Sequence, residues 1–124
     1  MLLHLDFSLD TPIYQQIRNE IVRGIAAGSL VPGQQLPTIR ALAETLGVNV
    51  MTVNKAYALL KQEGYLRADR RSGTVVAGRT GPLTDDLRAA LELAAAQARA
   101  SGVPLEEVLA VCRGVYEETE GGQG

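Results

Sequence analysis

Apolar residues recur at helical spacing along the first third of the chain. The repeating positions are Ile13, Ile17, Ile21 and Ile25. This spacing predicts a helix with one apolar face that ends near Gly28. Proline suits the first helical position because its missing N–H is not needed there, so Thr11 and Pro12 make a good helix entry. We expect the apolar face to pack into a core and Arg18 and Arg23 to lie toward solvent.

Two shorter helical patterns follow, joined by a turn of only a few residues. Thr38 can cap the start of the first, and Gly47 permits a left-handed exit from its end. Asn49, or alternatively Thr52, can cap the second, which Gly64 stops. Their apolar positions are Ile39, Leu42, Ala43, Leu46, Val53, Ala56, Tyr57, Leu59 and Leu60. Helices joined so tightly must cross steeply, as in a helix-turn-helix.

A strand pattern comes next, in residues 65–69 and again in residues 74–77. The residues between them, 70–73, predict a hairpin tip in which Gly73 takes a positive φ. A helix-turn-helix followed by such a hairpin is the order of a winged helix-turn-helix. The predicted fold class is therefore α+β, mainly α.

The start of the second short helix carries the candidate binding chemistry. Its residues are Asn49, Val50, Met51, Thr52, Asn54 and Lys55. In a helix-turn-helix this end faces base edges in the major groove, where amides and hydroxyls can bond bases or phosphates. Lys55 can reach a phosphate, and Val50 or Met51 can contact a thymine methyl. Arg70 and Arg71 on a narrow hairpin suit the minor groove. Taken without the hairpin, an ordinary helical hairpin with a polar surface is the less favoured alternative for the two helices.

The same residues resemble the GntR family of bacterial transcription regulators. The matching segments are TPIYQQIRNEIVRGIAAGSLVPGQQLPTIRALAETLGV, TVNKAYALLKQEGYL and the SGT of the hairpin. The short helical remainder resembles the YtrA type, in which a small two-helix piece replaces larger ligand-binding domains.

The resemblance implies roles for particular residues. Arg40 matches a family arginine that contacts the DNA backbone, and Gly73 matches the wing glycine that approaches the minor groove. In the family, the second short helix is the recognition helix. The positions around its start that the family uses on DNA are occupied here by Asn49, Val50, Met51, Thr52 and Asn54. Val50 and Asn54 depart from the family, since many members have arginine at both places. Guanine readout by two arginines is therefore not implied for this chain.

The net charge of −2 divides unevenly along the chain. Residues 1–78 carry eight Lys or Arg against six Asp or Glu, and residues 79–124 carry four against eight. Phosphate contact depends on local potential, so the basic excess in the first part suits DNA. Because this excess is small, we expect tight binding to require a second subunit that doubles the phosphate contacts.

A Gly/Pro-rich run at residues 78–82 predicts a linker. The expected domains are a winged helix-turn-helix at 1–78, with an N-terminal arm at 1–10, and a two-helix region at 79–124. The arm is apolar and could pack on its own domain or on a partner subunit. Its apolar residues are Leu2, Leu3, Leu5 and Phe7.

The two-helix region has an apolar stripe on each helix. Thr84 with Asp85 and Asp86 suits the start of the first helix, which ends by Gly102, and Pro104 opens the second. The stripes comprise Leu87, Leu91, Ala94, Ala95 and Ala98, then Leu105, Val108, Leu109, Cys112, Val115 and Tyr116. So small a pair buries too little surface to stand alone, which predicts a homodimer interface. Folding back on its own winged helix is the alternative.

Composition argues against several classes of protein. Cys112 is the only cysteine and His4 the only histidine. We therefore expect no intramolecular disulfide, no cysteine-rich or histidine-based metal site, no cofactor and no catalytic residues. No glycine-rich phosphate loop is present, and no apolar run is long enough to span a bilayer. The expected location is the cytoplasm, without membrane partners.

The sequence thus predicts a homodimeric, sequence-specific DNA-binding transcription regulator, with repression at a palindromic operator as the expected outcome. Two other classes stay open. One is a sensor that responds to a small effector or to oxidation of Cys112, although on its stripe Cys112 more often is a small core residue. The other is a winged-helix protein-interaction module without direct DNA readout. The sequence leaves the effector and the operator sequence undetermined.

Overall fold

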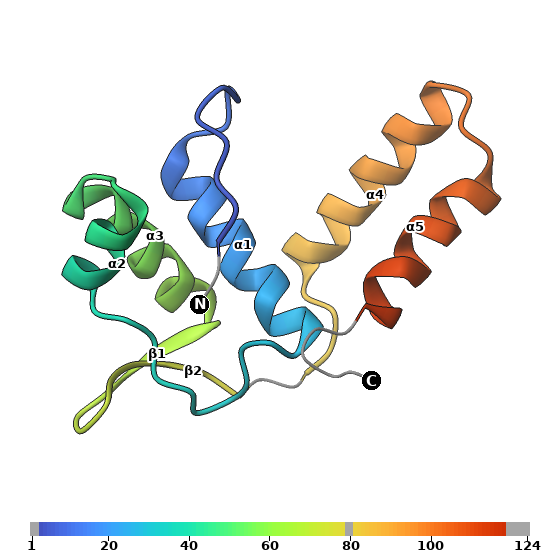
Figure 1. Ribbon diagram of the computed structural model, residues 1–124. Coiled ribbons are helices and arrows are strands. Elements are labelled where there is room, and N and C mark those ends of the chain that lie inside the picture. Colours follow the sequence, from blue (N-terminus) through green and yellow to red (C-terminus); the bar gives the residue numbers. More distant parts are fainter. Residues whose placement is uncertain (1–2, 79–80, 119–124) are drawn as a thin grey trace. The chain divides into compact units, whose positions relative to one another are not determined.

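The computed structural model describes residues 3–78 and 81–118, which fall into two compact units (Figure 1). The first unit holds α1 (Ile13–Ala27), α2 (Ile39–Leu46), α3 (Val50–Glu63), β1 (Leu66–Asp69) and β2 (Gly73–Val76). The second holds α4 (Asp85–Ala100) and α5 (Leu105–Glu117). This mainly helical α+β composition confirms the predicted fold class. Residues 1–2 of the predicted arm, 79–80 of the predicted linker and 119–124 lie outside the described residues.

The helix ends follow the predicted capping chemistry. The Thr38 hydroxyl accepts a hydrogen bond from the Ala41 N–H at 3.0 Å, which begins α2. Asn49, and not Thr52, caps α3. Gly47 ends α2 at φ 70°, the left-handed region that the short turn requires. The entry to α1 differs by one residue, because Pro12 is the N-cap and Ile13 the first helical residue.

The core of the first unit lies where α1 and α2 pack against α3. Ile17 and Ile21 of the predicted face are fully buried, whereas Ile13 and Ile25 are half-buried at its edge. The other buried members of the cluster are Leu30, Leu36, Leu42, Ala43, Val53, Ala56, Tyr57, Leu60, Leu66 and Val76. The packing of α1 and α2 thereby fixes α3, and the face of α3 that carries Asn54 and Lys55 is left at the surface.

The expectation that Arg18 lies toward solvent is wrong. Its guanidinium donates from Nε and Nη2 to the two carboxylate oxygens of Glu63, at 2.9 and 3.1 Å. The same group lies 5.6 Å from the centre of the Tyr65 ring. A planar guanidinium suits such a paired contact with a carboxylate, and its side chain is only 21% exposed. Arg23, by contrast, is exposed as expected.

The two strands form an antiparallel hairpin in which Leu66 pairs with Val76 and Asp69 with Gly73. β1 begins one residue later than predicted, at Leu66, and β2 is shifted by one residue, to Gly73–Val76. The Tyr65 N–H bonds the Leu60 carbonyl at the end of α3, while the Tyr65 carbonyl accepts the Ala77 N–H beside the hairpin. Gly73 opens β2 at φ 78°, so the predicted positive φ is confirmed. Residues 33–36 hydrogen-bond along the outer edge of β2 and cover it.

The N-terminal arm packs on its own domain in this structure. Leu3 and Leu5 lie against the hydrophobic cluster. The buried Gln16 side chain accepts from the Asp6 N–H and donates to the Asp6 and Thr11 carbonyls, which anchors the arm. Phe7, at the turn, is 66% exposed.

The second unit is a helical hairpin in which α4 contacts α5 (Figure 1). The Thr84 hydroxyl caps α4 by accepting from the Leu87 N–H. No residue in the described part of either helix is buried. The half-buried residues gather near the turn between them and are Ala98, Val103, Val108 and Leu109. The rest of both apolar stripes is exposed.

Candidate nucleic-acid interface

The start of α3 presents a mixed polar and apolar surface to solvent. Val50 is 45% exposed and Met51 68% exposed, although both are large apolar side chains. Asn54 and Lys55 are exposed one turn further on, and Thr52 is half-buried. These side chains stay outside because Val53, Ala56, Tyr57 and Leu60 turn the opposite face of α3 into the core. The local pattern therefore leaves the predicted binding residues accessible.

Asn49 does not offer its whole amide to a ligand. Its Oδ1 accepts the Met51 N–H at 2.7 Å and so caps the helix. A side-chain amide needs both its oxygen and its nitrogen to form a paired contact with adenine. As long as the cap is intact, only the side-chain nitrogen of Asn49 is free to contact a ligand.

Lys55 makes a contact that sequence analysis did not foresee. Its ammonium lies 4.1 Å from the centre of the Tyr14 ring, within the range of a cation–π interaction. Tyr14 belongs to the first turn of α1. Because the two residues are far apart in the chain and are paired only by the packing of α1 on α3, no local pattern indicates this contact.

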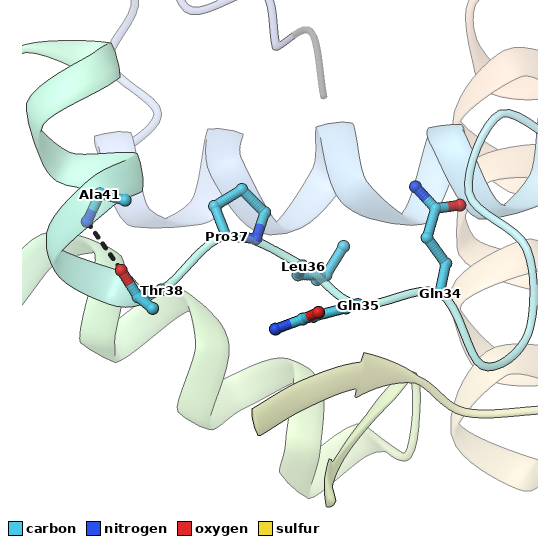
Figure 2. Close-up of a pocket in the computed structure, with 6 residues that line it drawn as sticks. All are labelled: Gln34, Gln35, Leu36, Pro37, Thr38 and Ala41. Atoms are coloured by element: carbon cyan, nitrogen blue, oxygen red, sulfur yellow. Dashed lines mark hydrogen bonds between the residues drawn. The ribbon is translucent and has the colours of Figure 1, made fainter. Parts of the chain in front are cut away.

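The start of α2 is the second part of the candidate interface. Arg40 is exposed on its first turn. Beside it lies an open hollow of about 450 Å³, lined by Gln34, Gln35, Leu36, Pro37, Thr38 and Ala41 (Figure 2). Figure 2 shows the Thr38 cap at one end of this hollow.

Tyr57 ties the start of α2 to α3. Its hydroxyl donates to the Pro37 carbonyl at 2.8 Å, next to the cap residue Thr38. Sequence analysis predicted Tyr57 as a core residue and missed this polar contact. α3 and the loop that leads to Arg40 are therefore joined by one part-buried hydrogen bond, which helps to fix the two parts of the candidate interface relative to each other.

Substitution of Tyr57 with phenylalanine tests this contact. Burial raises the pKa of Tyr57 from 10.0 to about 12. Between these values the unfolded chain releases the phenol proton and the folded chain keeps it, so stability falls as the pH rises. In Tyr57→Phe this alkaline loss should be smaller, while near neutral pH the free energy of unfolding drops by about 1 kcal/mol because the Pro37 carbonyl loses its donor.

Urea unfolding of both proteins at several pH values above neutrality measures both effects. If the two stability curves ran parallel up to strongly alkaline pH, Tyr57 would not be the buried titrating group that the structure describes.

The hairpin tip is the third part of the candidate interface. Arg70 and Arg71 are exposed there. The Asp69 carboxylate accepts the backbone N–H groups of Arg71 and Ser72, which holds the tip in shape and lowers the pKa of Asp69. The view in Figure 1 places this tip on the same side of α1 as α2 and the start of α3.

The part of the chain that the structure describes also bears on metal sites and membrane spans. It holds no cluster of three or more His, Cys, Asp or Glu placed to bind a metal ion. Its helices are all too short or too polar for a membrane span. Cys112, which the sequence places on the predicted dimer stripe, is an exposed free thiol in the single chain.

A family comparison agrees with this geometry. The model of the bacterial regulatory proteins of the gntR family matches residues 13–76. This span runs from the first residue of α1 to the last residue of β2. It therefore includes all three parts of the candidate interface.

Two curated relatives are similar to the chain. The HTH-type transcriptional regulator Rv1152 of Mycobacterium tuberculosis is 34% identical over 86% of this chain and 88% of its own length. The HTH-type transcriptional repressor YtrA of Bacillus subtilis is 36% identical over 60% of this chain and 58% of its own length. The first similarity extends past the winged helix into the second unit.

Two solved structures add three-dimensional likeness. YtrA from Sulfolobus acidocaldarius, a GntR-family transcription factor, is 39% identical, covers 81% of this chain and 99% of its own, and has a TM-score of 0.69. The DNA-binding domain of AraR in complex with operator ORX1 is 31% identical, covers 62% and 96%, and has a TM-score of 0.54. In the second case the similar domain is bound to operator DNA.

Proposed function

Because the chain belongs to the GntR family of bacterial regulatory proteins and is of the YtrA type, we propose that it represses transcription as a homodimer on a palindromic operator. The observation that carries this proposal is the surface of α3. Its exposed first turns combine apolar, amide and hydroxyl groups, and exposed arginines lie on the neighbouring α2 and hairpin tip. Such a set can contact bases and phosphates together. The proposal includes no catalytic chemistry, and it places the protein with the DNA in the cytoplasm.

In this proposal the first unit contacts DNA through three parts of its surface. Arg40 contacts the backbone, the α3 start enters the major groove, and the hairpin tip approaches the minor groove. The residues are Arg40, Asn49, Val50, Met51, Thr52, Asn54, Lys55, Arg70, Arg71 and Gly73.

The second unit supplies the dimer interface in this proposal. Large apolar side chains of α4 and α5 are exposed in the single chain, among them Leu87, Leu91, Leu105 and Val115, and Tyr116 is 91% exposed. Exposed apolar surface of this extent marks an interaction site. A second copy of the same hairpin offers a matching surface, and alanines such as Ala94 and Ala95 allow close approach.

Repression follows from occupancy. A dimer bound across a promoter excludes other proteins from it without further chemistry. The relative YtrA of Bacillus subtilis is a transcriptional repressor by name, which supports the same outcome here.

Selection of bound sequences from a random duplex pool, at a stated salt concentration, tests the proposal. We expect a palindrome whose half-sites lie about one helical turn, or 10 base pairs, apart. Without enrichment of any sequence, the winged helix would serve a protein partner or require an effector, and the proposal would fail.

Replacement of Arg40 with alanine tests the backbone contact. We expect weaker binding to every DNA sequence. The slope of the logarithm of the binding constant against the logarithm of the salt concentration should become shallower by about 1 for each subunit, because one phosphate contact is lost. A salt series of binding constants measures the slope. Arg23→Ala is the matched control, since Arg23 is an exposed arginine on α1. Equal slopes for Arg40→Ala and the parent protein would refute the phosphate contact.

A further inference from the structure

We propose that α3 reads A·T base pairs, with Val50 and Met51 contacting thymine methyl groups and Asn54 contacting adenine, and that it directs no cation at guanine. This inference rests on the proposed DNA-binding function and specifies which base pairs the recognition helix selects.

The first support is the exposure of two apolar side chains. Val50 and Met51 are 45% and 68% exposed at the first turn of α3. The two neighbouring side chains together place apolar surface at the end of α3 that the proposed function directs into the major groove. The only apolar group that a base pair presents in the major groove is the thymine methyl.

The second support is the difference between the two asparagines. Asn49 uses its Oδ1 in the α3 cap. Asn54 is exposed, and no hydrogen bond within the described residues occupies its amide. It follows Val50 by four residues and Met51 by three, so the three side chains share one face of the helix. A free amide at this place can form the paired contact with adenine N6 and N7.

The third support is the position of Lys55. A guanine contact requires an arginine or lysine that reaches O6 and N7. Lys55 is the only cation among residues 50–60, and its ammonium lies 4.1 Å from the Tyr14 ring centre. The Tyr14 ring thus holds this charge beside α1, at the flank of the Val50, Met51 and Asn54 face, where a phosphate rather than a base edge is its natural partner.

Methyl deletion in the selected operator tests the inference. Deoxyuridine pairs as thymine does but lacks the methyl group, so it is placed at single thymines within the half-sites. We expect about a fourfold loss of affinity per half-site at the contacted thymine. In the Val50→Ala, Met51→Ala double variant this loss should disappear. Gln62→Ala, an exposed change near the end of α3, is the control and should keep it.

A second experiment replaces the side-chain amide of Asn54. Asn54→Arg introduces a guanine-directed cation, so a fresh selection with this variant should replace A·T by G·C at the position that faces residue 54. The inference would be overturned if deoxyuridine had no effect at any position, or if the parent operator had an invariant guanine facing α3. Sequence-specific binding would stand in both cases. A pool without any enriched sequence would overturn the proposed function itself, and the inference with it.

Discussion

Replacement of Leu91 with aspartate is expected to convert the dimer into monomers and to weaken operator binding by at least about 100-fold. Leu91 is 50% exposed in the middle of α4 and lies on the stripe with Leu87 and Ala95. If a second copy covers this stripe, a carboxylate there is buried without a partner, which strongly disfavours association. A monomer then holds one half-site with half of the phosphate contacts.

The same α4 helix provides the control for this experiment. Leu93 is 61% exposed, and two residues after Leu91 it lies on the other side of the helix. Leu93→Asp should therefore leave both the dimer and the affinity nearly unchanged. Sedimentation equilibrium measures the mass, and fluorescence anisotropy the affinity. A parent protein that already sediments as a monomer, or equal behaviour of the two variants, would contradict the interface.

The second large effect concerns the position of the recognition helix. Leu60→Ala should lower the free energy of unfolding by about 2–5 kcal/mol, because it removes a fully buried side chain from the contact between α3 and the core. A small domain has little stability to lose, so much of the variant should be unfolded at moderate temperature. Urea unfolding followed by circular dichroism measures the change.

Leu59→Ala is the matched control, since Leu59 is the adjacent leucine on the same helix but is only half-buried. The same atoms are removed, so the difference between the two variants isolates burial. We expect the Leu59→Ala change to cost well under half as much. Equal costs would mean that α3 does not turn its Leu60 face into the core, and the exposed face assigned to DNA would then be wrong.

Local chemistry explains why most of the fold was predictable. Thr38, Asn49 and Gly47 act within a few residues of their own position, so capping and turn geometry can be recognised in the sequence. The apolar period of α1 likewise predicts its buried face. Errors occurred where a distant residue decides the outcome. Arg18, for example, pairs with Glu63, which is 45 residues away.

The candidate site was predictable in part for the same reason. The cap residue and the spacing of the apolar residues define the start of α3 and its buried face, so the exposed residues of this helix could be named from the sequence. The contacts that hold these residues in place could not be predicted. The Lys55–Tyr14 and Tyr57–Pro37 contacts form only when α1, α2 and α3 pack together. The assignment of these residues to DNA and of the α4 and α5 stripes to a dimer stays a prediction.

The central claim is that a symmetric dimer recognises a specific sequence. The most direct test compares, at one stated salt concentration, the affinities for the selected palindrome, the same duplex with one half-site scrambled, and a random duplex. We predict that the palindrome binds at least about 1,000-fold more tightly than the random duplex, and that scrambling one half-site removes most of this advantage. Equal affinities for all three duplexes would contradict the claim.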